Sequence, residues 1–413
     1  MADKKRVLVV GGGFGGLFTA LGLAGSADVT LVSKMEHYLH TPMLYEYMSG
    51  EIEAWHIAPT YSELVGDDFE IVRGEVTAID LESRTATVDS RHDPFSYDAL
   101  VLAPGGVSNF WGVPGAEEHA VQFRTIAQAD SLRHRMTEAL DNIPPETAPQ
   151  DVREKLTFVV VGAGASGVEL STKMSDLLRD AVKRRALQGE PRVLIVEMGD
   201  RIVPGMGSEL REFVQHALND LRVEVHTETR VVSVGPNSVT VEHNGEQTEI
   251  ASAATVWVAG VKVSPLIETL PLKKDEQGLV LVDPTLQARG YPGIFVLGDV
   301  AKVKDVTPQL AGTAQLAFQE SELAAANVKA FLAGRELRTK AFAELGEAVS
   351  LGTENAAVLV GNKPFGGPLA RQARFTLYTT RLPTWHHRLK VGASWFFEGT
   401  TPRPLLPLGF ERS

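Results

Sequence analysis

Short apolar runs that end in glycine clusters set the pattern of this chain. Residues 6–10 are Arg-Val-Leu-Val-Val, and the glycines after them lead into apolar positions over 17–24 and a second apolar run over 29–32. Continuous runs of β-branched residues and leucine are typical of strands that are covered on both faces. The pattern therefore predicts a strand, a helix and a strand, which together form a βαβ unit.

The same order recurs about 150 residues further along the chain. A strand, a glycine turn, a helix and a strand are predicted at 157–161, 162–167, 168–186 and 193–197. Further strands, followed by one long helix, are predicted at 231–234, 238–241, 255–258, 293–300 and 314–332. We therefore expect an α/β protein with two Rossmann-like dinucleotide-binding domains.

Composition narrows the classes of function. The 413 residues include 52 acidic and 40 basic ones, a net charge of −12, which argues against a general nucleic-acid binder. No apolar run reaches the roughly 18 residues of a membrane-spanning helix. The absence of cysteine excludes disulfide scaffolds, thiolate metal sites, cysteine nucleophiles and dithiol redox chemistry.

Two other features of the sequence add little to the functional prediction. His37 and His40, and the adjacent His386 and His387, have no third ligand at a suitable spacing, so we expect no metal site. The apolar stretch near the N-terminus contains five glycines over residues 11–16, which favours a strand and turn over a signal peptide. We therefore expect a cytoplasmic protein.

The first glycine turn fits the dinucleotide fingerprint Gly-x-Gly-x-x-Gly at residues 11–16. The first glycine allows a tight turn, the second lets the backbone approach a pyrophosphate, and the third lets the helix pack on the strand. The next strand ends in a serine and a lysine, which can bond a ribose and offset phosphate charge. The candidate contacts are Gly11, Gly13, Phe14, Gly15, Gly16, Ser33 and Lys34. The alternative is a turn with a purely structural role.

The second turn repeats the fingerprint with Gly162, Gly164 and Gly167, and its following strand ends in Glu197. A carboxylate there accepts hydrogen bonds from the adenosine ribose and repels a 2′-phosphate, which favours NADH over NADPH. An exposed glutamate at a strand end is the alternative.

Glu169 follows the third glycine of this second turn. One interpretation is a capping role, because a helix dipole stabilises an acid in the first turn. The other is a catalytic role beside the nicotinamide, with the carboxyl contacting the carboxamide or handling a proton. Both interpretations stay open.

Two more stretches complete a resemblance. With the two glycine units, residues 97–105 (Tyr-Asp-Ala-Leu-Val-Leu-Ala-Pro-Gly) and 293–299 (Gly-Ile-Phe-Val-Leu-Gly-Asp) resemble the two-dinucleotide flavoprotein reductases. The resemblance implies FAD on the first unit and NAD(P)H on an inserted second unit. It also implies FAD contacts at Val76, Ala103, Gly298 and Asp299, with Asp299 on the ribityl chain.

Within that superfamily, the lack of cysteine discards the disulfide reductases, thiol peroxidases and sulfide–quinone reductases. Three stretches look like type II NADH dehydrogenase, the single-subunit NADH–quinone oxidoreductase: 40–46, 257–262 and 314–319. The resemblance implies cofactor contacts at Thr41, Gly260, Ala314 and Gln315. It also implies a quinone pocket with Gln315 and Gln319, for which an ordinary polar helix face is the alternative. A helix start at Ala314 would stabilise the negative charge of a reduced flavin.

The domain division that follows is 1–120 and 276–340 for FAD, 121–275 for NADH, and 341–413 for a C-terminal membrane-associating region. From residue 363 onward there are eight basic and two acidic residues. Arg371, Arg374, Arg381 and Tyr378 share one helical face, and apolar and aromatic residues follow over 389–397. We expect peripheral binding to the cytoplasmic face of the membrane. The alternative is docking on the protein's own fold or on a homodimer mate.

The predicted function is oxidation of NADH with electron transfer through FAD to a membrane quinone, without proton pumping. Protons for the quinol would come from Glu169 or from solvent. Two other functions stay open. One is a soluble NADH-dependent reductase of ferredoxin or rubredoxin, and the other is a redox-gated flavoprotein that binds a partner.

Overall fold

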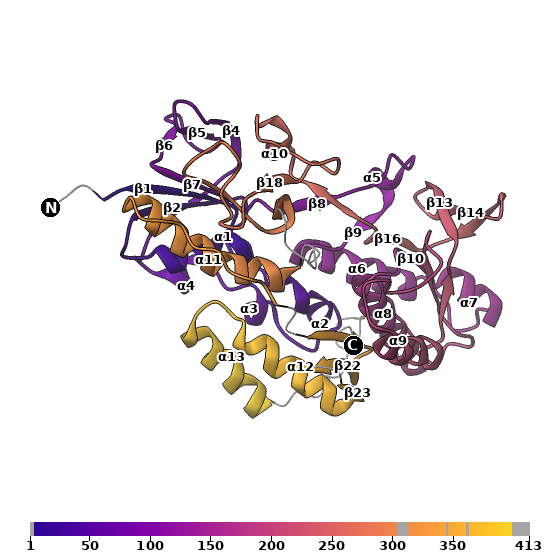
Figure 1. Cartoon of the computed structure of the whole chain (residues 1–413). Coiled ribbons are helices and arrows are strands. Elements are labelled where there is room, and N and C mark those ends of the chain that lie inside the picture. The colour runs from indigo at the N-terminus through magenta and orange to yellow at the C-terminus, as the bar shows by residue number, and fades with distance from the viewer. Residues whose placement is uncertain (1–3, 304–312, 344–345, 361–362, 399–413) are drawn as a thin grey trace.

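The computed structural model describes residues 4–303, 313–343, 346–360 and 363–398, and the first glycine unit forms its first parallel sheet (Figure 1). The strand order is β19 (Ile294–Val296), β7 (Ala99–Leu102), β1 (Arg6–Val10), β2 (Asp28–Ser33) and β3 (Glu70–Arg73). Register pairs Val7 with Val29 and with Ala99. Helix α1 (Phe14–Leu23) packs beside α11 (Ala314–Leu332), where a side chain at Gly22 would meet Ala325.

The second glycine unit forms a second five-stranded parallel sheet. Its order is β12 (Val223–His226), β11 (Arg192–Val196), β10 (Thr157–Val161), β16 (Ala254–Trp257) and β9 (Val121–Gln122). All of these strands lie between β7 and β19 in the sequence, so the second sheet is inserted into the first. The helices around it are α5 (Ala116–His119), α6 (Ile126–Asp141), α7 (Pro149–Lys155), α8 (Ala165–Arg184) and α9 (Ser208–Asp220).

Both central helices begin earlier than the apolar pattern predicts. Helix α1 starts at Phe14 and α8 at Ala165, directly inside the glycine turns. In each case the N-cap is the second glycine, Gly13 or Gly164, in extended backbone geometry. The free N–H groups of each helix therefore belong to the turn itself, where an anion can approach them.

Smaller elements surround the two sheets. The three-stranded sheets are β4 (Val76–Asp80), β5 (Thr85–Val88) and β6 (Phe95–Ser96), and β13 (Thr229–Val234), β14 (Ser238–His243) and β15 (Glu246–Ala251). Two-stranded ribbons join β8 (Gly106–Ser108) to β17 (Val261–Val263) and β18 (Val280–Val282) to β20 (Ala301–Val303). Short helices are α2 (Leu44–Met48), α3 (Ala54–Ile57), α4 (Tyr61–Val65) and α10 (Pro265–Thr269), with single 3-10 turns at Thr41–Met43 and Gly298–Val300.

The C-terminal segment folds back across both units. It consists of the antiparallel strands β21 (Glu347–Leu351), β22 (Asn355–Val360) and β23 (Lys363–Gly367), then α12 (Pro368–Thr380) and α13 (Trp385–Glu398). Phe375 of α12 shares one apolar core with Met48 of α2 and Leu170 of α8. In the described part of the chain, no helix has the length and apolar character needed to cross a membrane. The final residues of the predicted tail, 399–413, lie outside the described residues.

Candidate active site

The first glycine turn is shaped by close backbone contacts. Gly11 has φ +101°, and a Cβ on it would lie 2.1 Å from the carbonyl oxygen of Ala103. A Cβ on Gly16 would lie 1.7 Å from the carbonyl oxygen of Gly11. In contrast, a Cβ on Gly13 would stand in open space. The first and third glycines therefore serve packing, and the second leaves room for a ligand to touch the backbone.

That open space belongs to a cavity of about 440 Å³. It brings together predicted FAD contacts from seven separate segments: Gly11, Gly13, Phe14, Gly15, Ser33, Lys34, Thr41, Val76, Ala103, Gly298, Asp299 and Ala314. Gly16 lies behind the turn, against Gly11. The glycine turn lines one part of the cavity and the ends of several strands line the rest, which fits a dinucleotide.

The end of β2 shows one contact that sequence reasoning missed. Tyr61 donates its hydroxyl hydrogen to the carbonyl oxygen of Gly12 at 2.9 Å, and its oxygen lies 3.1 Å from Oγ of Ser33. A side chain on Gly12 would collide with this phenol. Lys34 forms an ion pair with Glu75 at 2.6 Å, so its charge is partly compensated before any phosphate arrives.

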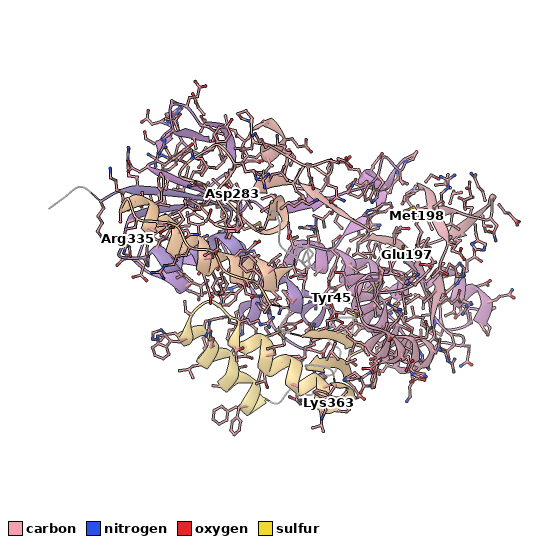
Figure 2. All side chains as sticks on the ribbon, viewed as in Figure 1. Tyr45, Glu197, Met198, Asp283, Arg335 and Lys363 are labelled. Carbon is pink, nitrogen blue, oxygen red and sulfur yellow. The ribbon has the colours of Figure 1, made fainter. Side chains whose placement is uncertain are left out.

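The second glycine turn repeats the first. Gly162 has φ +108°, a Cβ on Gly167 would lie 1.9 Å from the carbonyl oxygen of Gly162, and Gly164 is open. The carboxylate of Glu197 accepts hydrogen bonds from the N–H groups of Ala163, at 2.8 Å, and Gly199, at 2.7 Å. Glu197 is thus fixed beside the turn where a ribose would lie, as Figure 2 shows for its position in the second unit.

Gly260 follows β16 at the edge of this second turn. It has φ +89°, and a Cβ on it would come within 2.8 Å of the indole nitrogen of Trp111. Trp111 itself has a positive φ and donates from Nε1 to the carbonyl oxygen of Ala259 at 3.2 Å. The neighbouring Ala259 packs against Gly162. Gly260 is therefore a close-approach position, and the tryptophan beside it gave no signal in the sequence.

The two glutamines at the start of α11, Gln315 and Gln319, differ in their hydrogen bonding. Helix α11 begins at Ala314, as predicted, because Thr313 accepts a hydrogen bond from the N–H of Leu316. The buried Nε2 of Gln315 has no hydrogen-bond partner among the described residues. Gln319 bonds both the N–H and the carbonyl oxygen of Ala343. The amide of Gln319 thus ties α11 to the segment at 343, and a place for Gln319 in a quinone pocket stays a prediction.

Glu169 lies in the second turn of α8, so it is not a helix cap. Its Oε1 accepts from the N–H of Ser350, at 2.8 Å, and from Arg374, at 2.9 Å. Burial raises the pKa of Glu169 to about 7, although the guanidinium of Arg374 opposes this shift. A carboxyl with this pKa exchanges protons at neutral pH, as a catalytic acid must.

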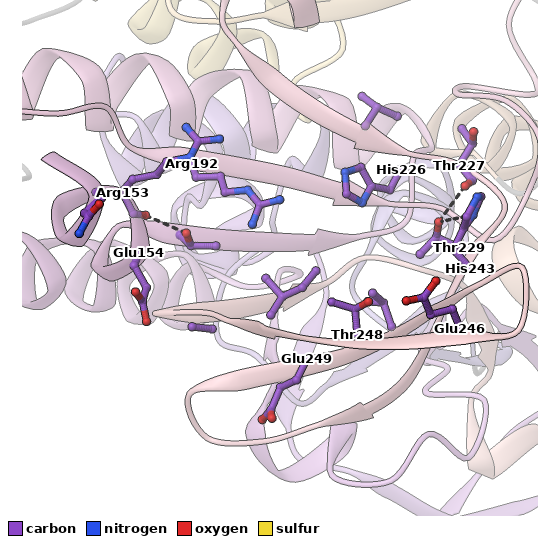
Figure 3. Close-up of a pocket in the computed structure, with 16 residues that line it drawn as sticks. Arg153, Glu154, Arg192, His226, Thr227, Thr229, His243, Glu246, Thr248 and Glu249 are labelled. Carbon is purple, nitrogen blue, oxygen red and sulfur yellow. Dashed lines mark hydrogen bonds between the residues drawn. The ribbon is translucent and has the colours of Figure 1, made fainter.

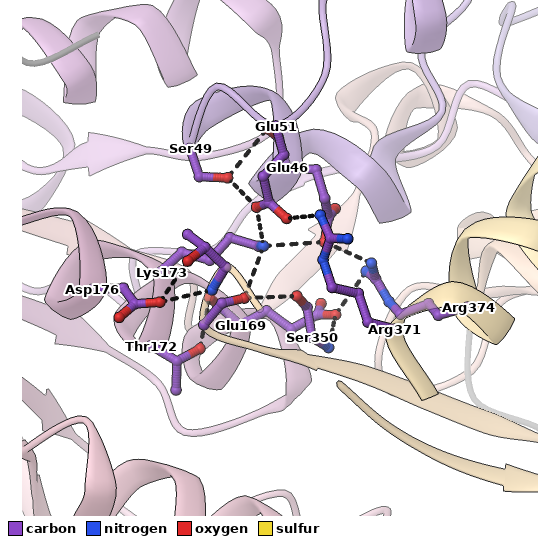
Figure 4. A network of polar contacts seen from close by, with 12 residues as sticks. Glu46, Ser49, Glu51, Glu169, Thr172, Lys173, Asp176, Ser350, Arg371 and Arg374 are labelled. Atoms are coloured by element: carbon purple, nitrogen blue, oxygen red, sulfur yellow. Dashed lines mark hydrogen bonds and ion pairs between the residues drawn. The ribbon is translucent and has the colours of Figure 1, made fainter. Parts of the chain in front are cut away.

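Glu169 belongs to a charged junction that the sequence gave no means to assemble. Figure 4 shows its six charged members, which come from three segments of the chain: Glu46, Glu51, Glu169, Lys173, Arg371 and Arg374. Arg374 pairs with Glu46 at 2.6 Å, Arg371 pairs with Glu51 at 2.9 Å, and Lys173 contacts both glutamates. Three acids face three bases, so the buried charges are balanced when all three carboxyls are ionised.

The electrostatic environment of the junction gives its acids different pKa values. Burial alone would raise the pKa of Glu46, but Arg374 and Lys173 lower it to about 2. Glu46 is therefore ionised at neutral pH, while Glu169, which shares Arg374 with it, stays close to half-protonated. One carboxyl thus acts as a fixed counter-ion and the other as an exchangeable proton site.

The chain is similar to known proteins along nearly its whole length. The sequence profile of the pyridine nucleotide-disulphide oxidoreductases matches residues 5–318. The chain is 34% identical over 408 residues to demethylphylloquinone reductase NdbB of Synechocystis sp., and 96% of each protein is covered. It is 30% identical over 413 residues to type II NADH:quinone oxidoreductase NdhA of Mycobacterium tuberculosis, which covers 96% of this chain and 87% of the relative. The chain belongs to the type II NADH:quinone oxidoreductases, within the wider pyridine nucleotide-disulphide oxidoreductase family.

Solved structures agree on the fold. NDH2 of Plasmodium falciparum, in complex with NADH, superposes with a TM-score of 0.83 at 17% identity, covering 97% of this chain and 100% of that one. The sulfide:quinone oxidoreductase of Aquifex aeolicus gives 0.74 at 19% identity, with 95% of each chain covered. FAD and NAD(H) are the nucleotides of the type II family, and the two open glycine turns fit them. The predicted resemblance is confirmed.

The tail of this type II oxidoreductase needs a correction. We expected Arg371 and Arg374 to face an anionic membrane, but their side chains are only 6% and 1% exposed and pair with acids of the junction. Large apolar side chains are exposed on α13 instead. Trp385, Leu389 and Phe396, on one face of α13, are 61%, 63% and 82% exposed. Docking on the protein's own fold, the alternative to membrane contact, holds for the arginine face of α12.

A second cavity, of about 950 Å³, lies between the edge of the second parallel sheet and β13–β15 (Figure 3). None of the predicted site residues lines it. Two of its basic side chains, Arg153 and Arg192, are bonded to Glu224. Both of these arginines of the oxidoreductase are therefore already paired with an acid inside the protein.

Proposed function

We propose that this chain oxidises NADH and passes the electrons through bound FAD to a quinone, without pumping protons. The observation that carries the proposal is the pair of open glycine turns in a chain without cysteine. Reducing equivalents that enter at the second turn have no dithiol in the protein to reduce, so they leave to an external acceptor. The names of the relatives indicate that the acceptor is a quinone.

Different groups of the protein have different roles in the proposed reaction. Glu197 receives the ribose hydroxyls of NADH and rejects a 2′-phosphate. The N–H groups at the starts of α1 and α8 hold the two pyrophosphates. Bound FAD supplies hydride acceptance and electron release. The start of α11 offers a positive helix end and the amide of Gln315, and Glu169 holds a proton for the quinol.

Steady-state NADH oxidation tests the proposal. The acceptors to compare are a short-chain naphthoquinone, a short-chain benzoquinone, a ferredoxin and none. Fast turnover with a quinone supports the proposal, and the faster quinone identifies the ring type. Fast turnover with ferredoxin alone would indicate a soluble ferredoxin-type reductase. Slow turnover with all acceptors would indicate a redox-gated binding protein.

We further propose that the enzyme binds the cytoplasmic face of the membrane through the outer face of α13. The exposed aromatic side chains of that face suit the headgroup region of a bilayer. A tail deletion is a poor test because it would also remove Arg374 from the charged junction. Replacing both Phe396 and Phe397 by serine should weaken liposome binding. Replacing Met198, which is exposed on the second unit (Figure 2), should not. Equal binding by both proteins would refute this mode of attachment.

A further inference from the structure

His40 lies between the FAD cavity and the tail helix α12. Its sequence neighbours Leu39 and Thr41 line that cavity. The ring of Phe14, which also lines the cavity, has its centre 5.2 Å from the imidazole of His40. On the other side, the ring of Tyr378 on α12 lies 5.5 Å away. The imidazole is completely buried. His40 therefore occupies the layer that separates the electron donor from the tail.

Polar atoms in this layer are left without hydrogen bonds. Within the described ranges, Nε2 of His40, Oε2 of Glu46 and Nε of Arg374 have no partner, although all three are buried. His40 interacts electrostatically with both Arg374 and Glu46, so the three side chains form one cluster. Each buried, unpaired polar atom destabilises the protein, because it has lost its hydrogen bonds to water without gaining others. Several in one cluster indicate that a polar atom from outside the protein completes it.

The imidazole of His40 has a defined protonation state. Burial, reinforced by Arg374, lowers the pKa of His40 to about 3, so the ring is neutral at physiological pH. Its Nδ1 lies 3.4 Å from the hydroxyl oxygen of Tyr38. Burial raises the pKa of Tyr38, so this phenol keeps its proton and can donate it to Nδ1. Nε2 then carries the ring hydrogen and is a free donor.

We propose that the Nε2–H group of His40 donates a hydrogen bond to a carbonyl oxygen of the quinone. This inference rests on the proposed function and adds a binding residue to it. A quinone head is a flat apolar ring with two carbonyl acceptors. The layer around His40 offers the aromatic rings of Phe14 and Tyr378 and one neutral donor, which match those two properties.

Three variants of His40 test the position of the donor. His40→Gln keeps an amide near the place of Nε2, His40→Asn keeps one near Nδ1, and His40→Phe keeps only the ring shape. The dissociation constant of a short-chain quinone is measured by calorimetry on the FAD-loaded protein, together with quinone KM. Anaerobic reduction of the flavin by NADH is followed separately. Tyr47→Phe, which keeps the ring and loses only a hydroxyl that bonds Asp130, is the matched control.

We expect His40→Phe and His40→Asn to raise the quinone dissociation constant about three- to tenfold, the effect of one lost hydrogen bond. His40→Gln and Tyr47→Phe should stay within about twofold, and flavin reduction should be unchanged in all four variants. An unchanged dissociation constant in His40→Phe would mean that the cluster holds a water only. Equal losses in the Gln and Asn variants, or impaired flavin reduction, would also overturn the inference. If the unaltered protein neither binds nor reduces any quinone, the proposed function itself fails.

Discussion

The first glycine turn and the charged junction both organise the candidate active site, but they are built in opposite ways. The turn uses six consecutive residues, and its contacts are made by backbone atoms. The junction uses six side chains from three segments, with Glu46 and Arg374 more than 300 residues apart. A turn of this kind is encoded locally, whereas the junction exists only after the sheets and the tail have come together.

Removing a charge from the junction should have the largest effect of the variants considered, and this effect is on thermal stability. Arg374→Met leaves Glu46 and Glu169 as buried acids without their shared counter-ion. Removing one partner of a buried ion pair costs about 3–5 kcal/mol. At roughly 2 °C per kcal/mol for a chain of this size, Tm should fall by about 6–10 °C.

Arg381→Met is the control for this loss of charge. Arg381 lies one residue beyond α12, and no ion pair with an acid is found for it in the described residues. Its Tm should change by about 1 °C or less, as for most substitutions away from buried charge pairs. Equal shifts in the two variants would show that the junction contributes no more than any tail arginine.

The same contrast explains what the sequence could predict. Strands β1 and β10 and helix α11 have the predicted bounds, because each follows from an apolar run with clear ends. The lining of the FAD cavity was largely anticipated from spacing and family resemblance. The contacts of Tyr61 and Lys173 and the inward direction of Arg371 could not be predicted. A tyrosine or a lysine in a helix has no local pattern that names its partner, and an amphipathic helix does not reveal which face meets the protein.

The two turns can be separated by a matched pair of variants. A Cβ on Gly13 or Gly164 meets no protein atom, so Gly13→Ala and Gly164→Ala should fold normally. Each methyl group would stand where a pyrophosphate meets the backbone and weaken charge-assisted hydrogen bonds. We expect Gly13→Ala to lower FAD affinity about 10- to 100-fold. Gly164→Ala should raise the KM for NADH and leave FAD affinity unchanged. FAD titration and NADH kinetics on both proteins check this, and loss of FAD from both would show that the turns are not independent.

Glu197 tests what distinguishes the second turn from the first. Glu197→Arg should shift the ratio of kcat/KM for NADH and NADPH about tenfold toward NADPH, because repulsion of the 2′-phosphate becomes attraction. Glu197→Gln controls for the hydrogen bonds to Ala163 and Gly199, since its amide oxygen can still accept one of them. It should shift the ratio less than the arginine does. An unchanged ratio in Glu197→Arg would mean that the ribose lies elsewhere.

The smallest predicted effect concerns the exchangeable proton of the junction. Burial raises the pKa of Glu169 to about 7, while Arg374 opposes this shift and Glu46 adds to it. About half of the carboxyl groups are therefore protonated at pH 7, and about a tenth at pH 8. If this proton goes to the quinol, the rate of quinone reduction should fall about fivefold from pH 7 to pH 8.

Two carboxamide variants decide which group causes that fall. Glu169→Gln cannot release the proton, so its rate should be lower but nearly constant over the same pH range. Glu320 is a second buried carboxyl, with its pKa raised by burial to about 8, but it accepts from the N–H of Gly298 at the FAD cavity. Glu320→Gln should keep the fall near pH 7. A pH profile that is the same with and without Glu169 would assign the proton to solvent. The junction would then have only a structural role, holding the tail against the two nucleotide-binding units.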